Sequence, residues 1–593
     1  MAEEPVVYMS KKTWQYSKGN RPKLIFYICL SVVKNLIYFL QPLVVAYLLN
    51  TIQKEGVTSN NLTKLFLITS LFVVITIITW VLHAPSRILE RKNAFHVRAN
   101  YKKYLIDGVL SLPPEWHTEH HSGDTIDKIE KGTIALYNFA GGTYDIIESV
   151  IRLITSVAVL FYFNFSSGIV VIFIAIIAVL IVLGYDKRLR NHYREINHAE
   201  NATSQKVFDV ISNITTIIIL RVQKIASSQI FKKIMHPFKT YEEYVTINEL
   251  KWALVSLLSS CMYFFVLMAY FLVVVSTGEA VLIGTVFALY SYVDNISGLF
   301  YRFAYKYSDI VMQKSAVENA EELAVDFKTE CINCSPISKD WRSIEIKHLT
   351  FSYDEPNYGK KRKDHIDLKD VDMKIRKGEK IALIGESGSG KTTFLKLIRG
   401  LYTPSEIDLR VDDKRITNFD DISESITLIP QDPEIFTTTI KENITMGMEY
   451  DDNMIKKHTN LACFTNVADR LPNKLLSNIK EKGVNLSGGE KQRLALSRGL
   501  LACEGKEIIL LDEPTSSVDS RNELQIYKNI FNEYKHKTML STVHRLHLLP
   551  LFDNIYYFKD GKIIARGSMH KLLKDYPEFR SLWKKYNNKR KKI

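Results

Sequence analysis

Six apolar blocks in the first half of the chain constrain the fold more than any other feature. They cover residues 23–50, 62–86, 134–163, 166–185, 250–276 and 281–312. Each meets or approaches the ~20 mostly apolar residues that a helix needs to cross a bilayer. The third block is the weakest, because Asp145, Glu148 and Arg152 interrupt it. We therefore predict an all-α transmembrane domain of six spans, embedded in the lipid bilayer, in a multidomain chain of 593 residues.

Basic residues indicate the orientation of these spans. Lys and Arg are frequent in the two long polar stretches, 87–133 and 186–249, and absent from the short turns near 164 and 277. Loops rich in Lys and Arg stay on the cytosolic side, so we expect both stretches and both termini on the cytosol or matrix side. Apolar residues recur at helical spacing within the stretches, which favours helical extensions of the spans over separate soluble domains.

The net charge of +14 also fits this topology. Such a charge can indicate a nucleic-acid partner or an anionic membrane surface. Lys and Arg exceed Asp and Glu by one in 87–133 and by three in 186–249, so these stretches carry part of it. No nucleic-acid-binding motif occurs, so we expect no nucleic-acid partner. The N-terminal tail, residues 1–22, lacks the pattern of a secretory signal or of an Arg-rich mitochondrial presequence.

Composition changes after the last apolar block. We assign 23–325 to the transmembrane domain and 326–343 to a linker. In 344–575 short apolar strands alternate with helical patterns, which is typical of an α/β domain. Residues 576–593 form a basic tail, and we expect its end, 584–593, to be disordered. Cys331 and Cys334 form a CxxC pair without a second pair, which is a weak metal signal.

A phosphate-binding motif opens the α/β domain. Residues 385–392, GESGSGKT, fit GxxxxGK[ST] between the apolar run 380–384 and a helical run from Phe394. The backbone N–H groups of such a loop bind phosphates at a helix N-terminus. Lys391 would hold the β- and γ-phosphates and Thr392 would ligate Mg²⁺. The ATP-binding residues predicted here are Gly385, Ser387, Gly388, Ser389, Gly390, Lys391, Thr392 and Thr393.

Two carboxylates follow a second apolar strand, 508–511. Asp512 fits a direct or indirect partner of Mg²⁺, and Glu513 fits a base that orients or deprotonates the attacking water. A solvated turn could also carry such a pair, but the phosphate loop in the same domain favours the catalytic interpretation.

The string 486–493, LSGGEKQR, resembles the signature of ATP-binding cassette (ABC) proteins. Further motifs follow in that family's order. Tyr353 resembles the aromatic residue that stacks on adenine, and Gln431 resembles the glutamine that senses Mg²⁺ and contacts the membrane domain. Asp519 resembles part of the loop that communicates across the dimer, and His544 the switch that contacts the γ-phosphate.

This resemblance implies a dimer that binds ATP and Mg²⁺. Ser487, Gly488 and Gly489 of one chain would meet the γ-phosphate held by Lys391 of the other. One chain has a single cassette, so it needs a partner. Because every expected motif residue is intact, including Glu513, a homodimer with a second copy is favoured.

Six spans before a cassette resemble the type IV ABC exporters. The chain is most similar to the mitochondrial exporters that serve iron–sulfur assembly and to their bacterial relatives. Residues 116–133 resemble that family's string in the first cytosolic loop. The signature ends in Glu490, as in that family's SGGEKQRLA. The run 190–201 resembles the stretch whose arginines help to bind glutathione-type substrates. The resemblance implies these substrate residues: Arg190, Arg194, Asn197 and Asn201.

The resemblance has gaps. The family's NSGQ-like patch in the fifth span is VSLLSS here, at 255–260, and its Glu–x–x–Lys string is TTII, at 215–218. Much of the family's substrate pocket is therefore not carried over. His117, His120 and His121 fall where the first coupling helix is expected, so we interpret them as interface or solvent residues.

Charged residues inside the spans have two interpretations. Lys34, Arg152, Asp294 and Arg302 lie within or near apolar blocks, where ionisable groups are costly. They could pair internally, as Asp294 with Arg302, or they could give a cavity a positive potential that suits an anionic cargo. We include Arg302 among the candidate substrate residues.

The sequence thus predicts an ATP-hydrolysing exporter. Its expected cargo is an anionic or thiol small molecule, such as a glutathione-derived compound linked to iron–sulfur assembly. The alternatives are a bacterial-type exporter of drugs, lipids or peptides, and a regulatory ABC protein that does not pump. The expected membrane is the inner membrane of a mitochondrion or of an organelle derived from it, with the plasma membrane as the alternative.

Overall fold

The computed structural model describes residues 3–120, 122–327, 336–353, 367–432, 434–479 and 486–590, although a few side chains in these ranges, Arg190 among them, are not described. Backbone contacts divide the chain into two units. The first comprises Met1–Leu112 and His120–Lys328, and the second Pro113–Glu119 and Thr329–Ile593.

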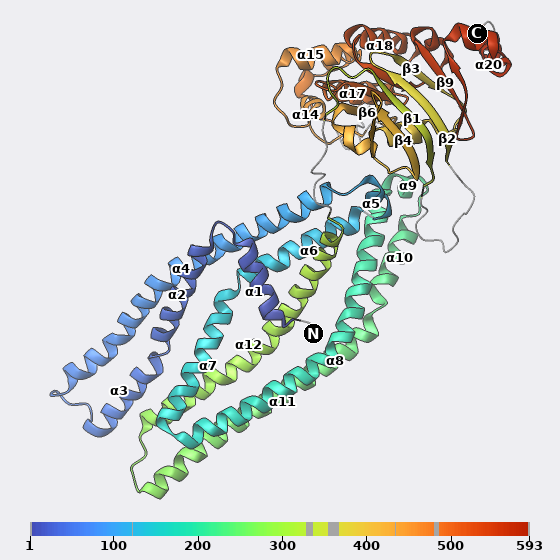
Figure 1. Ribbon diagram of the computed structural model, residues 1–593. Coiled ribbons are helices and arrows are strands. Elements are labelled where there is room, and N and C mark those ends of the chain that lie inside the picture. The colour runs from blue at the N-terminus through green and yellow to red at the C-terminus, as the bar shows by residue number, and fades with distance from the viewer. Residues whose placement is uncertain are drawn as a thin grey trace. The chain divides into compact units, whose positions relative to one another are not determined.

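The regular secondary structure of the first unit is helical among its described residues (Figure 1). Its helices are α1 (Pro5–Tyr16), α2 (Arg21–Tyr38), α3 (Gln41–Glu55), α4 (Leu62–Leu110), α6 (Ser122–Ala140), α7 (Thr143–Phe163), α8 (Phe165–Ser212), α9 (Ile214–Ile219), α10 (Gln223–Met235), α11 (Phe238–Thr277), α12 (Ile283–Glu322) and the 3₁₀ turn η1 (Leu323–Val325).

Several of these helices are much longer than a bilayer is thick. The helices α4 and α8 have 49 and 48 residues. At a rise of ~1.5 Å per residue each is about 70 Å long, whereas the hydrocarbon core of a bilayer is ~30 Å thick. The polar stretches after the second and fourth apolar blocks therefore continue the helices, as predicted from their periodicity.

Five helical segments among the described residues are long and apolar enough to cross a membrane. They are Arg21–Glu55, Leu62–Leu110, Ser122–Phe163, Phe165–Ser212 and Gln223–Thr277. The sixth predicted block forms the 40-residue helix α12. Its length suffices, but polar residues such as Asp294 and Asn295 lower its hydropathy. The predicted fold class, a helical transmembrane domain joined to an α/β domain, is confirmed.

Local sequence explains where the helices break. The first block is split between α2 and α3, because Pro42 belongs to the first turn of α3, where proline is tolerated. The third block is split at Gly141 and Gly142, between α6 and α7. The predicted hairpin between the third and fourth blocks is present. Asn164 ends α7, and its side chain caps α8 by accepting a hydrogen bond from the Ser167 N–H at 3.1 Å.

The second unit contains two sheets. The larger has the order β10-β9-β3-β8-β7-β6 and the smaller, antiparallel sheet has the order β2-β1-β4-β5. In the larger sheet β9, β3, β8, β7 and β6 are parallel and β10 is antiparallel. The strands are β1 (Ser343–Phe351), β2 (Leu368–Arg376), β3 (Lys380–Ile384), β4 (Glu406–Val411), β5 (Lys414–Ile416), β6 (Ile426–Ile429), β7 (Ile508–Leu511), β8 (Thr538–Thr542), β9 (Asn554–Lys559) and β10 (Lys562–Gly567).

Helices accompany these sheets. They are α5 (Pro114–Glu119), α13 (Lys391–Ile398), α14 (Ile440–Thr445), α15 (Asp452–Leu461), α16 (Thr465–Asp469), α17 (Gly488–Leu501), α18 (Ser520–Glu533), α19 (Met569–Asp575), α20 (Pro577–Arg590), and the 3₁₀ turns η2 (Phe419–Ser425), η3 (Lys474–Leu476) and η5 (Leu546–Leu551).

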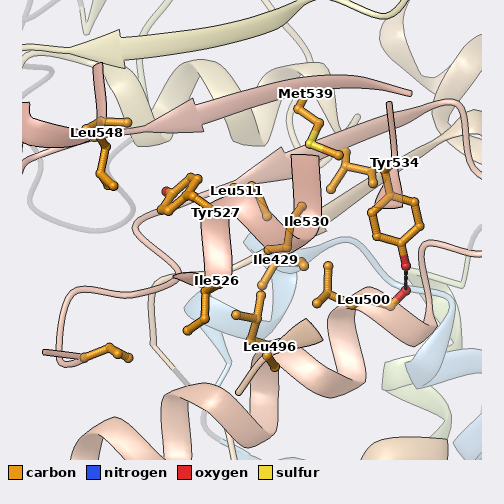
Figure 2. Close-up of a cluster of buried hydrophobic side chains, with 14 of the residues drawn as sticks. Ile429, Leu496, Leu500, Leu511, Ile526, Tyr527, Ile530, Tyr534, Met539 and Leu548 are labelled. Carbon is orange, nitrogen blue, oxygen red and sulfur yellow. Dashed lines mark hydrogen bonds between the residues drawn. The ribbon is translucent and has the colours of Figure 1, made fainter. Parts of the chain in front are cut away.

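Both faces of the central strands are buried. Alternate residues of β3 enter different cores: Ile381 and Leu383 pack with the smaller sheet and α13, whereas Ala382 and Ile384 pack with α17 and α18. This explains why these strands read as continuous apolar runs. In Figure 2 side chains from β6, β7, β8, α17 and α18 meet in the second of these cores, where the Tyr534 hydroxyl donates to the Leu500 carbonyl oxygen at 3.3 Å.

Two described residues of the predicted linker, Ile337 and Trp341, are buried with β1 and β2. One prediction at the C-terminal edge of the second unit is wrong. The final residues of the chain were expected to be disordered. Instead α20 extends to Arg590, and Phe579 at its start is fully buried. A buried aromatic side chain supplies the packing that a basic run alone lacks.

Candidate functional site

The four strands β3, β8, β7 and β6 are neighbours and parallel, so their carboxyl ends lie at one edge of the sheet. The segments that follow them contain the phosphate-binding motif 385–392, then His544, then Asp512 with Glu513, and then Gln431. Ligands of α/β domains bind outside the carboxyl ends of parallel strands. The topology therefore brings together segments that are up to 159 residues apart in the sequence (385 to 544).

The loop 385–392 has the shape of a phosphate cradle. Gly390 precedes α13 with a φ of 97°, in the left-handed region that favours glycine. A Cβ atom at Gly390 would lie 2.6 Å from Leu368 Cδ2, and one at Gly385 would lie 2.3 Å from the Phe558 carbonyl oxygen. Because only glycine fits, the backbone can turn tightly and present its N–H groups at the N-terminus of α13. The loop fits the phosphates of a nucleotide.

Lys391 lies inside this loop. Its Nζ atom donates to the carbonyl oxygens of Gly385 at 3.0 Å and Glu386 at 2.7 Å. Burial lowers the pKa of Lys391, against the opposing influence of Glu513 and Asp512. The ammonium group is therefore fixed at the floor of the loop by weak neutral acceptors.

A pocket of about 630 Å³ opens over the loop. The predicted residues that line it are Ser387, Gly388, Ser389, Gly390, Lys391, Thr392, Thr393, Gln431, Glu513 and His544. Asp367, Lys369, Asp560 and Gly561 complete the lining. A single cavity thus unites the phosphate-binding and the predicted catalytic residues.

Oxygen atoms suited to a hard cation meet beside the loop. The Thr392 and Thr542 hydroxyls both donate to Asp512 Oδ1, at 3.0 and 2.9 Å. Asp512 is only 3% exposed, and burial raises its pKa, against the hydrogen bonds from the two threonines. Hydroxyl, carboxylate and amide oxygens from Thr392, Asp512 and Gln431 are the ligand types that Mg²⁺ prefers. The donor set fits the predicted ion.

The three predicted catalytic residues form one cluster around Glu513. The Gln431 Nε2 atom donates to Glu513 Oε2 at 3.0 Å, and His544 Nε2 contacts Glu513 Oε1. The Glu513 backbone has a φ of 44° and its N–H donates to the Thr542 hydroxyl at 2.8 Å. A non-glycine residue in this conformation is strained, and such strain gathers at functional sites. The backbone directs the carboxylate into the pocket.

Tyr353 lies beside the phosphate loop. Its hydroxyl donates to Thr393 Oγ1 at 3.3 Å, and its ring packs edge-on against Tyr402 at 5.1 Å. About a third of its surface is exposed. A partly exposed aromatic ring beside the phosphate loop is compatible with the predicted stacking role.

The signature residues start α17. Ser487 caps the helix and Glu490 bonds back to the Ser487 N–H at 2.9 Å, forming a capping box. This N–H, together with Arg470, lowers the pKa of Glu490. Gly489 packs closely against the loop between β7 and α18, since a Cβ atom at Gly489 would lie 2.8 Å from the Ser517 carbonyl oxygen. The described residues that line the 630 Å³ pocket include none of 487–489.

Asp519 serves a local role in the described structure. It caps α18 by accepting hydrogen bonds from the Asn522 N–H at 3.0 Å and from the Asn522 side chain at 2.7 Å. These bonds lower its pKa.

Sequence reasoning assigned no role to three residues that hold this site together. Gln492 bonds to Glu513, Ser516 and Ser517, and Thr542 bridges Asp512 and Glu513. Arg545 donates to the carbonyl oxygens of Val518 and Ser516. Their positions next to the motifs were visible in the sequence, but their partners were not.

The predicted substrate residues divide between two helices. Arg194, Asn197 and Asn201 lie on α8 with Arg190, at spacings of four, three and four residues, which place them on one helix face. The Asn201 side chain accepts a hydrogen bond from Lys131 Nζ at 2.8 Å. Arg302 lies on α12 and pairs with Glu148 of α7 at 3.0 Å.

The suggested pair of Asp294 with Arg302 is not formed. The Asp294 carboxylate accepts instead from the Tyr263 hydroxyl at 2.7 Å, and Arg302 has the partner on α7. His117 lies in the short helix α5, as expected. His121, Cys331 and Cys334 lie outside the described residues.

Comparisons with known proteins agree with this architecture. The family model described as "ABC transporter transmembrane region" matches residues 24–299, and the model described as "ABC transporter" matches residues 368–516. The chain belongs to the ABC transporters. The second unit is its cassette, a transport-coupled ATP hydrolase.

A solved structure, "Structure of a bacterial Atm1-family ABC exporter with ATP bound", superposes with a TM-score of 0.81 at 19% identity, and covers 95% of this chain and 99% of that chain. At this identity the likeness shows the fold alone, that of a type IV ABC exporter half-transporter. The chain is a multi-pass membrane protein.

Curated relatives carry varied names. A "Multidrug resistance ABC transporter ATP-binding and permease protein" of Lactococcus lactis is 24% identical over 81% of this chain and 80% of its own length. "Heavy metal tolerance factor 1" of Caenorhabditis elegans is 27% identical over 81% of this chain and 59% of its own. Rat "ATP-binding cassette sub-family B member 6" is 26% identical over 81% of this chain and 57% of its own length. The chain thus spans less than two thirds of the latter two.

Proposed function

We propose that two copies of this chain form an ATP-driven exporter that moves an anionic or thiol small molecule away from the cassette side. One observation carries the proposal. The pocket holds the phosphate loop, Glu513 and His544, whereas the signature residues 487–489 of the same chain lie outside its lining. A second cassette, with its own signature, completes the site, and this chain can supply both halves.

The residues of the chain then divide the work. The N–H groups of 385–392 and Lys391 bind the phosphates, and Thr392 with Asp512 would hold Mg²⁺, which supplies charge neutralisation when bound. Glu513 accepts the proton of the attacking water or orients it, held by Gln431 and His544. Closure of the two cassettes around ATP and their release after hydrolysis drive alternating access.

The cargo proposal depends on basic and amide groups of the first unit. Arg190, Arg194, Asn197 and Asn201 share one face of α8, and Arg302 lies on α12. Guanidinium and amide groups bind carboxylates through directed hydrogen bonds. A glutathione-derived compound, with two carboxylates and a thiol, matches this chemistry and the resemblance to exporters of iron–sulfur assembly. We place the protein in the inner membrane of a mitochondrion or related organelle.

Reconstituted protein tests both halves of the proposal. We expect proteoliposomes with the cassettes outside to accumulate glutathione or its oxidised form when ATP and Mg²⁺ are added. Glu513→Gln would abolish accumulation, while Glu533→Gln, an exposed residue paired with Lys457, would not. ATPase activity that survives Glu513→Gln would show that Glu513 is not the catalytic base.

Variants of α8 test the cargo. Arg190→Ala and Arg194→Ala should raise the glutathione concentration for half-maximal ATPase stimulation roughly tenfold each. Arg188→Ala is the matched control, because Arg188 is an exposed arginine of the same helix on a different face. Stimulation by lipophilic cations without binding of glutathione would instead support a multidrug exporter, the function that the name of the Lactococcus relative describes. ATP hydrolysis without transport of any tested compound would support the regulatory alternative.

A further inference from the structure

A second cluster of charged and polar residues lies in the first unit, on helices other than α8. It consists of Lys34 on α2, Tyr144, Glu148 and Arg152 on α7, and Arg302 on α12, and we name it the α7 cluster. Lys34, Tyr144, Glu148 and Arg152 belong to segments apolar enough to cross a membrane, and Arg302 lies on α12, the sixth predicted block. Ionisable groups there are costly, so each needs a partner or a function.

The helix α7 arranges the centre of the cluster. Tyr144, Glu148 and Arg152 are four residues apart and therefore form one stripe on α7. Arg152 Nη2 lies 3.5 Å and Arg302 Nη1 lies 3.0 Å from the same atom, Glu148 Oε1. Two guanidinium groups from different helices thus converge on one carboxylate oxygen. The arrangement is a binding place for a carboxylate, occupied by a carboxylate of the protein.

Lys34, the remaining cation of the cluster, has no acidic partner among the residues that the structure describes. Lys34 Nζ donates to Asn35 Oδ1 at 3.1 Å and to the Tyr144 hydroxyl at 2.5 Å, both neutral groups. It lies 4.9 Å from the ring centre of Tyr38. Among the described residues Lys34 forms no ion pair within 4.0 Å, although the charges of Glu148 and Arg152 act on it.

Arg152 also has an unused donor. Its Nε atom is buried and has no hydrogen-bond partner within the described part of the chain. An unpaired buried donor is unfavourable, so a ligand that accepts a hydrogen bond from it gains affinity. The Arg302 side chain is half exposed, at 52%, which leaves one side of the cluster accessible.

The charges of the cluster do not balance. Lys34, Arg152 and Arg302 carry three positive charges, and Glu148 carries one negative charge. Asp294 acts on Arg152 as well, but its carboxylate bonds to the Tyr263 hydroxyl. Counting Asp294, one positive charge remains, and a single carboxylate would neutralise it.

We propose that the α7 cluster binds a carboxylate of the transported compound through Lys34 and Arg152, and that Glu148 is the internal carboxylate which the incoming one replaces on the arginines. The inference depends on the proposed export of an anionic cargo and names a recognition site besides the α8 face. The incoming carboxylate neutralises the excess positive charge of the cluster, and this pairing lowers the cost of moving the charged cargo through the membrane.

Binding measurements on the full chain in lipid nanodiscs test this site. The probes are glutathione and glutathione diethyl ester, in which both carboxylates are masked. We expect Lys34→Met and Arg152→Met to raise the Kd of glutathione roughly 10- to 100-fold, the effect of losing a hydrogen bond between charged groups. The ester should bind the wild type about as weakly as glutathione binds Lys34→Met. Glu148→Gln should lower the Kd of glutathione.

Matched controls come from the ion pair of Lys64 with Glu55, which is exposed where α3 and α4 meet. Lys64→Met and Glu55→Gln should leave the Kd of glutathione unchanged. Lys34→Arg should keep this Kd within about threefold of the wild-type value, which would show that misfolding does not explain the effect of Lys34→Met. Equal affinity of the wild type for glutathione and its ester, or no binding of either, would overturn the inference. Export of the ester at the same rate as glutathione would overturn the proposed carboxylate site. If Glu513→Gln abolished that export, the proposed ATP-driven export would still hold.

Discussion

The side-chain amide of Gln492, in the signature helix α17, donates a hydrogen bond to the backbone carbonyl oxygen of Glu513 at 3.2 Å. The same amide donates to Ser516 Oγ at 2.8 Å, and its oxygen accepts from the Ser517 N–H at 2.7 Å. Gln492 is 3% exposed. One buried side chain therefore ties the signature helix to the segment that contains Glu513.

Replacement of Gln492 should uncouple these segments. Gln492→Ala leaves the Ser517 N–H and the Glu513 carbonyl oxygen without this partner, at a cost of roughly 1–3 kcal/mol each. We expect kcat of ATP hydrolysis to fall tenfold or more, with KM for ATP changed less than threefold. Steady-state ATPase kinetics at saturating Mg²⁺ measure both constants.

Gln525→Ala is the control for this change. Gln525 is exposed on α18 and bonds only to the Asn529 side chain among the described residues. Its replacement should leave kcat within experimental error. An unchanged kcat in Gln492→Ala would show that the bridge has no catalytic effect.

Asp512 should cost the protein stability at neutral pH. Burial raises the pKa of Asp512 in the folded state above its unfolded value. A raised pKa means that the protonated form favours folding at low pH, and that this stability is lost as pH rises through the folded pKa. Asp512→Asn keeps an oxygen for Thr392 and Thr542 without the charge. In the absence of Mg²⁺ and nucleotide we expect the variant to be more stable than the wild type at pH 8.

Thermal unfolding in detergent with a chelator, from pH 8 down to about pH 4, near the ordinary pKa of an aspartate, measures this difference. The gap in Tm between Asp512→Asn and the wild type should shrink as pH falls. With Mg²⁺ and ATP present, the variant should lose its ATPase activity by a factor of about 100 or more. A pH-independent gap would contradict the assigned electrostatic cause.

The parts of the site that sequence could predict are local. Lys391, Thr392, Asp512 and Glu513 follow apolar strands directly, and a motif next to a strand defines both the backbone path and the side-chain chemistry. The rest depends on packing between distant segments. That Gln492 would bond to Glu513, or Arg545 to Ser516, follows from the order of strands β3-β8-β7-β6, which no short string encodes.

The membrane unit shows the same limit more strongly. Hydropathy located the spans, whereas Pro42 and Asn164 explain the helix breaks only once the structure is known. The partner of Arg302 was not predictable from spacing on its own helix, because Glu148 lies 154 residues away on α7. Which helix faces meet is decided by side-chain packing along 40 or more residues, and charged groups then pair across the contact.

Close packing leaves no space for a side chain at Gly489 in α17. A Cβ atom there would lie 2.8 Å from the Ser517 carbonyl oxygen, whereas a Cβ at Gly488 would lie 3.9 Å from the Ser517 Cβ. Gly489→Ala must displace the backbone of the 516–518 segment, at a cost of about 1–3 kcal/mol. We expect a clear fall in Tm. Gly488→Ala, which meets only ordinary contact, should leave Tm unchanged or raise it. Equal Tm values for the two variants would contradict this packing.

Arg545 should fix the loop that the resemblance assigns to communication across the dimer. Its guanidinium donates to the carbonyl oxygens of Val518 at 2.9 Å and Ser516 at 3.2 Å, and it pairs with Glu523 at 3.1 Å. A lysine cannot reproduce this planar set of donors. Arg545→Lys should therefore lower kcat of ATP hydrolysis about threefold to tenfold while the Kd of ATP stays the same. Arg521→Lys, at an exposed position of α18, should change neither constant. If Arg545→Lys weakened ATP binding and kcat to the same extent, the residue would act on the phosphate pocket itself and not through the loop.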